Sequence, residues 1–169
     1  MALKSDLQVK AEGFLHSAHS ALKQSSVYAA FPKNEEAVYN FRRAANTFAT
    51  ASMWEEAGHA HLEAAEAEIT IHRKLEAAME YLEAGKYLRR IATDDAIQVE
   101  LKGVKILCDL GLFERAAHVY LTIAEVYEDD NQLEPAIEYY QHVSLLGTRG
   151  ERTEALVLPE SARTGMRHG

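Results

Sequence analysis

The sequence predicts an all-α fold, a right-handed α-solenoid of antiparallel helix hairpins. Ala, Glu and Leu dominate the 169 residues, and only three prolines occur. Clusters of Val, Ile and Thr that have the length of a strand and are bounded by turn signals are missing. An alanine also recurs about every 20 residues, and this internal repeat is typical of stacked helices.

The first expected helix covers residues 5 to about 24 and precedes the repeat. Its apolar side chains recur at helical spacing, so we expect it to cap the open end of the stack. They are Leu7, Ala11, Phe14, Leu15, Ala18 and Leu22.

Six alanines mark the entrances of the helices that follow, at intervals of 20, 21, 18, 20 and 20 positions. Acidic residues precede most of them, and a negative charge in the first turn complements the helix dipole. Pro135 is tolerated in such a turn because its missing N–H is not needed there. The alanines are Ala37, Ala57, Ala78, Ala96, Ala116 and Ala136.

Short breaks at residues 51–53, 72–74, 92–94, 109–112 and 129–132 provide the hairpin connections. A helix pair then takes about 40 residues, slightly more than the 34-residue unit of the tetratricopeptide repeat (TPR) that it otherwise resembles. Large side chains are expected to fill the spaces between layers. They are Phe41, Phe48, Trp54, Tyr81, Tyr87, Leu101, Phe113, Tyr120, Tyr127 and Tyr140.

Residues 1–146 are expected to form this repeat domain. Its last helix covers residues 135 to about 146, with an apolar stripe of Ile137, Tyr140, Val143 and Leu146, part of which is expected to be bare. Residues 147–169 have no lasting periodicity and are expected to be a disordered tail.

The charge balance argues against nucleic acid as a partner. Asp and Glu total 26 against 18 Lys and Arg, which gives a formal charge of −8. The single cysteine, Cys108, cannot form an internal disulfide and reads as a small buried hydrophobe. Since there is no apolar run of about 18 residues, a cytoplasmic protein with only peripheral membrane contact is expected.

The sequence has no Gly-rich phosphate loop, nucleophile elbow or paired-cysteine motif, so no catalytic residue, metal or cofactor is expected. His59 and His61 with Glu63 are the nearest approach to a metal site. Residues i and i+2 point to different sides of a helix, which makes surface or groove histidines the better interpretation.

Basic residues on successive helices interrupt the acidic chain. If the superhelix aligns them, they form a positive stripe for an acidic helical partner; the alternative is a scatter of solvated charges. They are Arg42, Arg43, Arg73, Lys74, Lys86, Arg89, Arg90, Lys102 and Lys105.

The connection at residues 25–32 is unusually apolar for a surface loop. Val27, Tyr28 and Phe31 there could dip into a bilayer, or could fold back as a staple on the first helix pair.

Residues 37–140 resemble the soluble NSF attachment proteins (SNAPs), most closely the α/β type. The motifs that carry the resemblance keep their order over about 110 residues. They are Arg43-Ala44-Ala45-Asn46-x-Phe48, Trp54-x-x-Ala57-Gly58-x-Ala60, Glu83-Ala84-Gly85-x-x-Leu88, Asp109-x-Gly111-x-Phe113, Ile123-Ala124-Glu125-Val126-Tyr127-Glu128 and Pro135-Ala136-Ile137-x-Tyr139-Tyr140.

The resemblance implies an adaptor, not an enzyme, that grips the SNARE complex, a syntaxin-type four-helix bundle, and recruits the NSF-type hexameric ATPase in membrane fusion. It implies SNARE contacts at Arg43, Arg89, Arg90 and Lys102. It also implies membrane contact through Val27, Tyr28 and Phe31.

The family continues for a similar length past Tyr140, so we expect a truncated or competing form with weakened or lost ATPase recruitment. The alternative is a TPR-type co-chaperone or other peptide-binding scaffold. An enzyme is a distant third interpretation.

Overall fold

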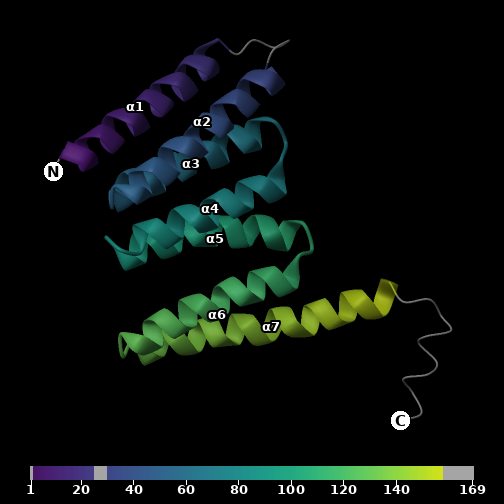
Figure 1. The fold of residues 1–169 in the computed structure, drawn as a ribbon. Coiled ribbons are helices and arrows are strands. Elements are labelled where there is room, and N and C mark those ends of the chain that lie inside the picture. Colours follow the sequence, from purple (N-terminus) through teal and green to yellow (C-terminus); the bar gives the residue numbers. More distant parts are fainter. Residues whose placement is uncertain (1, 25–29, 158–169) are drawn as a thin grey trace, which may run out of the picture. The chain divides into compact units, whose positions relative to one another are not determined.

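Every described element of regular structure is an α-helix, which confirms the predicted class. The computed structural model describes residues 2–24 and 30–157, with side chains for 3–24 and 31–150. Seven helices follow one another through these ranges (Figure 1). They are α1 (Ala2–Lys23), α2 (Ala30–Thr50), α3 (Trp54–Thr70), α4 (Lys74–Leu88), α5 (Thr93–Asp109), α6 (Phe113–Asp129) and α7 (Leu133–Val157).

The chain divides into two compact units, Met1–Ile106 and Leu107–Gly169. In the first unit α1 packs on α2, α2 on α3 and α3 on α4; in the second, α6 packs on α7. Helices two apart also touch in the first unit, because His19 of α1 pairs with Glu63 of α3 and Arg42 of α2 pairs with Glu80 of α4. This stacking of consecutive helices confirms the predicted hairpin architecture.

Four of the connections between helices have the same backbone turn, which explains why the predicted breaks are similarly short. One residue in each adopts a left-handed φ of 58° to 74°, and two successive N–H groups bond to carbonyls three and five residues earlier. This is the Schellman helix ending. The left-handed residues are Ser52, His72, Gly111 and Asn131.

The connection between α4 and α5 is different. It was expected at residues 92–94, but α4 already ends at Leu88. The N–H groups of Arg90 and Ile91 bond to carbonyls only three residues back, those of Tyr87 and Leu88, so a tighter 3₁₀-like turn ends this helix.

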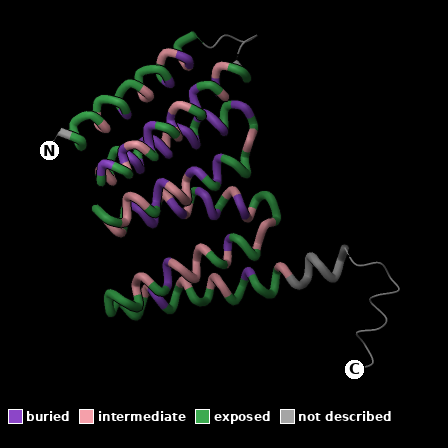
Figure 2. Tube along the Cα trace, in the orientation of Figure 1, coloured by how far each residue is buried: buried purple, intermediate pink, exposed green. Residues whose placement is uncertain are grey.

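Small side chains line the contacts between helices, and the six repeating alanines are all buried. Figure 2 shows that buried residues recur along the helices. A Cβ on Gly58 would lie 2.6 Å from Cγ of Leu88, and one on Gly103 would lie 2.9 Å from the carbonyl oxygen of Ala78. The α3–α4 and α4–α5 pairs therefore approach more closely than a methyl group would allow.

Large side chains fill the layers mostly as predicted, with Phe41 and Phe48 fully buried. Tyr140 is an exception, because it is exposed on α7 and its hydroxyl donates to Glu128 of α6 at 2.6 Å. The apolar stripe of the last helix is partly bare, as expected, because Ile137 is exposed whereas Leu146 is buried.

The end of the last helix was also predicted wrongly, since α7 continues past residue 146 to Val157. The loss of apolar periodicity after residue 146 does not end the helix, and Gly147 and Gly150 each cost only about 1 kcal/mol within a helix that is already formed. Pro159 is the stronger stop signal, because the residue before a proline avoids helical geometry. Residues 158–169 lie outside the described part, so a disordered tail and the domain boundary at 146 stay predictions.

Candidate interaction surface

Arg43 lies on the exposed side of α2, where two aromatic rings support its charge. Its guanidinium carbon is 3.9 Å from the ring centroid of Phe14 on α1 and 5.3 Å from that of Tyr39 on α2. A cation within about 6 Å of a ring face is attracted by the π electrons. The rings therefore fix the position of Arg43 and leave its charge accessible.

Arg90 and Lys102 have similar aromatic supports. The guanidinium carbon of Arg90 lies 4.1 Å from the ring of Trp54, which itself stacks on Tyr87 at 6.2 Å. Nζ of Lys102 on α5 is 5.8 Å from the ring of Tyr81 on α4. Both basic residues are exposed, so their charges remain available to a partner.

Arg89 has a different environment, because its guanidinium pairs with the buried carboxylate of Glu100 on α5. Gly85 makes room for this pair, since a Cβ there would overlap the Glu100 side chain. Burial raises the pKa of Glu100 above its ordinary value even with Arg89 beside it. Arg89 therefore joins α4 to α5, and its predicted contact with a SNARE bundle stays a prediction.

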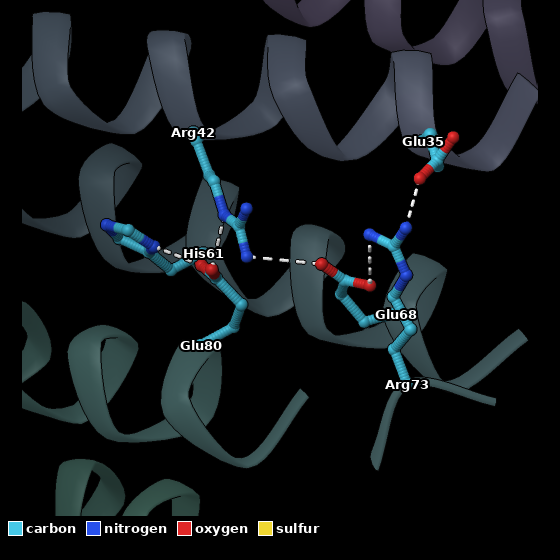
Figure 3. A network of polar contacts seen from close by, with 6 residues as sticks. All are labelled: Glu35, Arg42, His61, Glu68, Arg73 and Glu80. Atoms are coloured by element: carbon cyan, nitrogen blue, oxygen red, sulfur yellow. Dashed lines mark hydrogen bonds and ion pairs between the residues drawn. The ribbon is translucent and has the colours of Figure 1, made fainter. Parts of the chain in front are cut away.

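A network of charges around the buried Glu68 and Glu80 connects α2, α3 and α4 (Figure 3). Arg42 donates from Nε to Glu80 at 2.5 Å and from a terminal nitrogen to Glu68 at 3.1 Å. Nδ1 of His61 donates to the other oxygen of Glu80 at 2.7 Å. The carboxylates of Glu68 and Glu80 therefore share the guanidinium of Arg42.

Arg73, in the turn between α3 and α4, extends this network to the start of α2. It pairs with Glu35 and lies 3.9 Å from the second oxygen of Glu68, as Figure 3 shows. Its guanidinium carbon is also 5.1 Å from the ring centroid of Phe31. Arg42 and Arg73, both expected in the positive stripe, are thus used inside the fold.

The pKa values of the two buried carboxylates, Glu68 and Glu80, are shifted in opposite directions. Burial alone would raise the pKa of Glu80, but the hydrogen bond from His61 and the charge of Arg42 hold it below its ordinary value. Burial raises the pKa of Glu68, although Arg42 and Arg73 oppose this shift. The charges of both arginines therefore favour the ionised form of Glu68, against the effect of its burial.

Comparison with known proteins identifies the family. A family model described as "Soluble NSF attachment protein, SNAP" matches residues 9–153, which is most of the chain. The chain belongs to the SNAP family. Human alpha-soluble NSF attachment protein is 33% identical over 118 residues, which are 69% of this chain and 40% of the relative.

Other curated SNAP relatives give the same picture. The alpha protein of Mus musculus is 32% identical over 143 residues, 81% of this chain and 48% of the relative. The beta protein of Bos taurus is 32% identical over 136 residues, 80% of this chain and 45% of the relative. The chain therefore spans less than half the length of these SNAPs.

The SNAP residues predicted to touch a membrane are only partly described. Val27 and Tyr28 lie outside the described residues. Phe31 is in the first turn of α2 and is 50% exposed, which fits a contact residue better than a buried staple. No described helix is long and apolar enough to cross a membrane.

The remaining candidate residues are His59, His61 and Cys108. His59 is exposed and His61 is buried in the charge network. No described group of three or more His, Cys, Asp or Glu side chains is arranged to hold a metal ion. Cys108 is half-buried, and burial followed by the charge of Asp109 raises the pKa of its thiol.

The buried acidic residues were missed by the sequence analysis, although a signal was present. Ala57, His61, Ala64 and Glu68 recur at helical spacing on one face of α3, and that face is buried. A glutamate in phase with buried alanines indicates an internal salt bridge, because ionised side chains are buried only with a partner.

Proposed function

We propose that this chain is a SNAP-type adaptor that binds an acidic, syntaxin-type SNARE bundle through the exposed cations Arg43, Arg90 and Lys102. The observation that supports this proposal is that each of these cations packs on an aromatic ring. Rings that hold long side chains in place reduce the entropy lost on binding. Positive charge in a chain of net charge −8 then attracts a negative partner locally.

The proposed role is that of an adaptor and not of an enzyme: it would link SNARE bundles to an NSF-type hexameric ATPase during membrane fusion. Peripheral membrane contact through Val27, Tyr28 and Phe31, from the cytoplasm, is part of the proposal. The contribution of the 169 residues to ATPase recruitment is proposed to be weaker than that of a full-length SNAP.

A pull-down with two baits tests the class of partner. The SNARE bundle should capture the chain, and an acidic C-terminal chaperone peptide should not. Capture by the peptide alone would favour the TPR-type co-chaperone and would contradict the proposal.

A disassembly assay tests the adaptor step. The 169-residue chain, added in excess to full-length SNAP, ATPase and SNARE bundle, should slow disassembly in proportion to its affinity for the bundle. Efficient disassembly with this chain as the sole adaptor would show instead that it recruits the ATPase fully.

A further inference from the structure

The turn between α3 and α4 lies beside the start of α2. Arg73 of this turn contacts the ring of Phe31 and pairs with Glu35, both in the first two turns of α2. Figure 1 shows the α3–α4 turn at the same end of the first unit as the beginning of α2. Side chains of the two elements are therefore presented together.

Three large apolar side chains are exposed at this end. Phe31 is 50% exposed, Ile69 at the end of α3 is 40% exposed, and Leu75 at the start of α4 is 36% exposed. Ile71 between them is buried and anchors the turn to the core. Exposed large apolar side chains at the same end of a compact unit are typical of an interaction site.

Basic side chains accompany them. His72, Arg73 and Lys74 are consecutive, and no acidic residue occurs from position 69 to position 75 in this acidic chain. His72 and Lys74 are both exposed, and His72 has the left-handed φ of 62° at the tip of the turn.

The carboxylates in the neighbourhood leave His72 and Lys74 as the available basic groups of the turn. Glu35 pairs with Arg73 and neutralises it, and Glu36 pairs with Lys33 at 2.9 Å. Glu68 is buried, whereas Glu76 is exposed in the first turn of α4, the turn that Lys74 begins.

The equivalent turn between α6 and α7 has the same backbone but carries Asp129 and Asp130. The positive charge is therefore not a requirement of the Schellman ending.

From this geometry we infer that the α3–α4 turn is a second contact point for an anionic lipid bilayer, with Ile69 and Leu75 entering the interface beside Phe31. His72 and Lys74 face the lipid headgroups. The inference rests on the proposed membrane contact of Phe31 and extends it to a different part of the chain. These side chains project from two helix ends and a turn, so a fluid surface accommodates them better than one helix of a partner protein.

Two contact points have a mechanical consequence. A single apolar loop leaves the protein free to tilt, whereas a second point on the adjacent hairpin restricts the angle between the helices and the membrane. Apolar burial and attraction to anionic lipid add to each other in such peripheral binding.

The test is cosedimentation of the full 169-residue chain with vesicles of phosphatidylcholine, with and without about 30 mol % phosphatidylserine. The double variant Ile69→Ser/Leu75→Ser should lose about tenfold in partitioning onto the anionic vesicles. Lys74→Glu changes the charge by two units, and its partitioning should fall about fivefold for each unit. This loss should occur only on the vesicles that contain phosphatidylserine.

Ile91→Ser is the matched control. Ile91 is 57% exposed next to Arg89 and Arg90, but it follows the other end of α4, and 15 helical residues span about 22 Å. Its replacement should change partitioning less than about twofold, within the scatter expected for side chains away from the interface. A loss as large as that of the double variant would overturn the inference.

Two further outcomes separate this inference from the proposed function. In one outcome, replacement of Val27, Tyr28 and Phe31 by Ser abolishes vesicle binding, while the variant Ile69→Ser/Leu75→Ser binds like wild type. The membrane contact through Phe31 then stands, and the contact through the α3–α4 turn is refuted. If the wild-type chain binds no anionic vesicles, both membrane contacts are wrong, whereas SNARE binding is measured separately. Lys74→Glu, a substitution at an exposed site, gives the answer if the double variant does not fold.

Discussion

Replacing Arg42 by leucine tests whether the charge network stabilises the first unit. Arg42 donates to Glu80 at 2.5 Å and to Glu68 at 3.1 Å. Without it, the fully buried Glu68 keeps only Arg73, 3.9 Å away. The variant therefore leaves a buried negative charge with little compensation.

The expected loss of stability depends on how deeply Arg42 and its partner Glu68 are buried. Removing one partner of a fully buried ion pair costs about 3–5 kcal/mol. The Arg42 side chain is 42% exposed, so water already weakens the pair and the expected loss is about 2–3 kcal/mol. For a chain of this length that loss corresponds to a fall in Tm of about 5–10 °C.

Urea unfolding followed by the fluorescence of Trp54 measures this loss, because Trp54 is the single tryptophan and lies in the same unit. Arg43→Leu is the matched control and should cost less than about 1 kcal/mol, the value of an exposed cation–π contact. Adding Glu68→Gln to Arg42→Leu should restore about half of the loss, because it removes the uncompensated charge. Equal costs for Arg42→Leu and Arg43→Leu would refute the reasoning.

Acid should reduce the difference between wild type and Arg42→Leu. In wild type the pKa of Glu80 is lowered, so its stabilisation is present at neutral pH and is lost as the pH falls through the folded-state pKa. Without Arg42, Glu68 and Glu80 take up protons in the folded state at a higher pH, and this relieves their cost. A difference that grows as the pH falls would contradict this account.

Three further predictions concern the turns, the close helix contacts and Arg89. Ser52→Gly should raise the free energy of unfolding by about 1 kcal/mol in urea titration, because glycine adopts the left-handed φ of 59° without strain. Gly103→Ala should lower it by about 1–3 kcal/mol, whereas the matched Gly13→Ala, with open space around it, should raise it slightly. Arg89→Glu should lower the Tm far more than Arg90→Glu, since only Arg89 pairs with buried Glu100; equal Tm values would contradict the structural role of Arg89.

The sequence was sufficient for the architecture because the repeat is local. Alanines in phase and acidic first turns specify where α3 to α7 begin, and the structure places all six alanines in the core. The start of α2 was predicted wrongly, because this helix begins at Ala30, seven residues before Ala37, with no acidic residue in its first turn. Ser52, His72 and Asn131 were harder to assign, because a left-handed turn at a residue other than glycine leaves a weak signal. The end of α7 was predicted wrongly because a helix can continue where its apolar periodicity fades, and α7 runs on to Val157.

The candidate surface was less predictable because charge pairing depends on contacts between helices. Arg43, Arg90 and Lys102 are exposed as expected, but Arg89 and Arg42 pair with glutamates 11, 26 and 38 positions away. Counting basic residues along helices cannot distinguish an available cation from one that neutralises a buried carboxylate. Only the phase of Glu68 with buried alanines hinted at this use.

The affinity of the chain for a syntaxin-type SNARE bundle, measured by titration at low and high salt, tests the central proposal most directly. Wild type should bind at low salt and weaken steeply as salt rises, because the contacts are between exposed charges. Reversal of Arg43, Arg90 and Lys102 to Glu should weaken binding at low salt by about 10- to 100-fold and flatten the salt dependence, whereas Lys86→Glu should have little effect. Unchanged affinity of the triple variant at low salt would contradict the account.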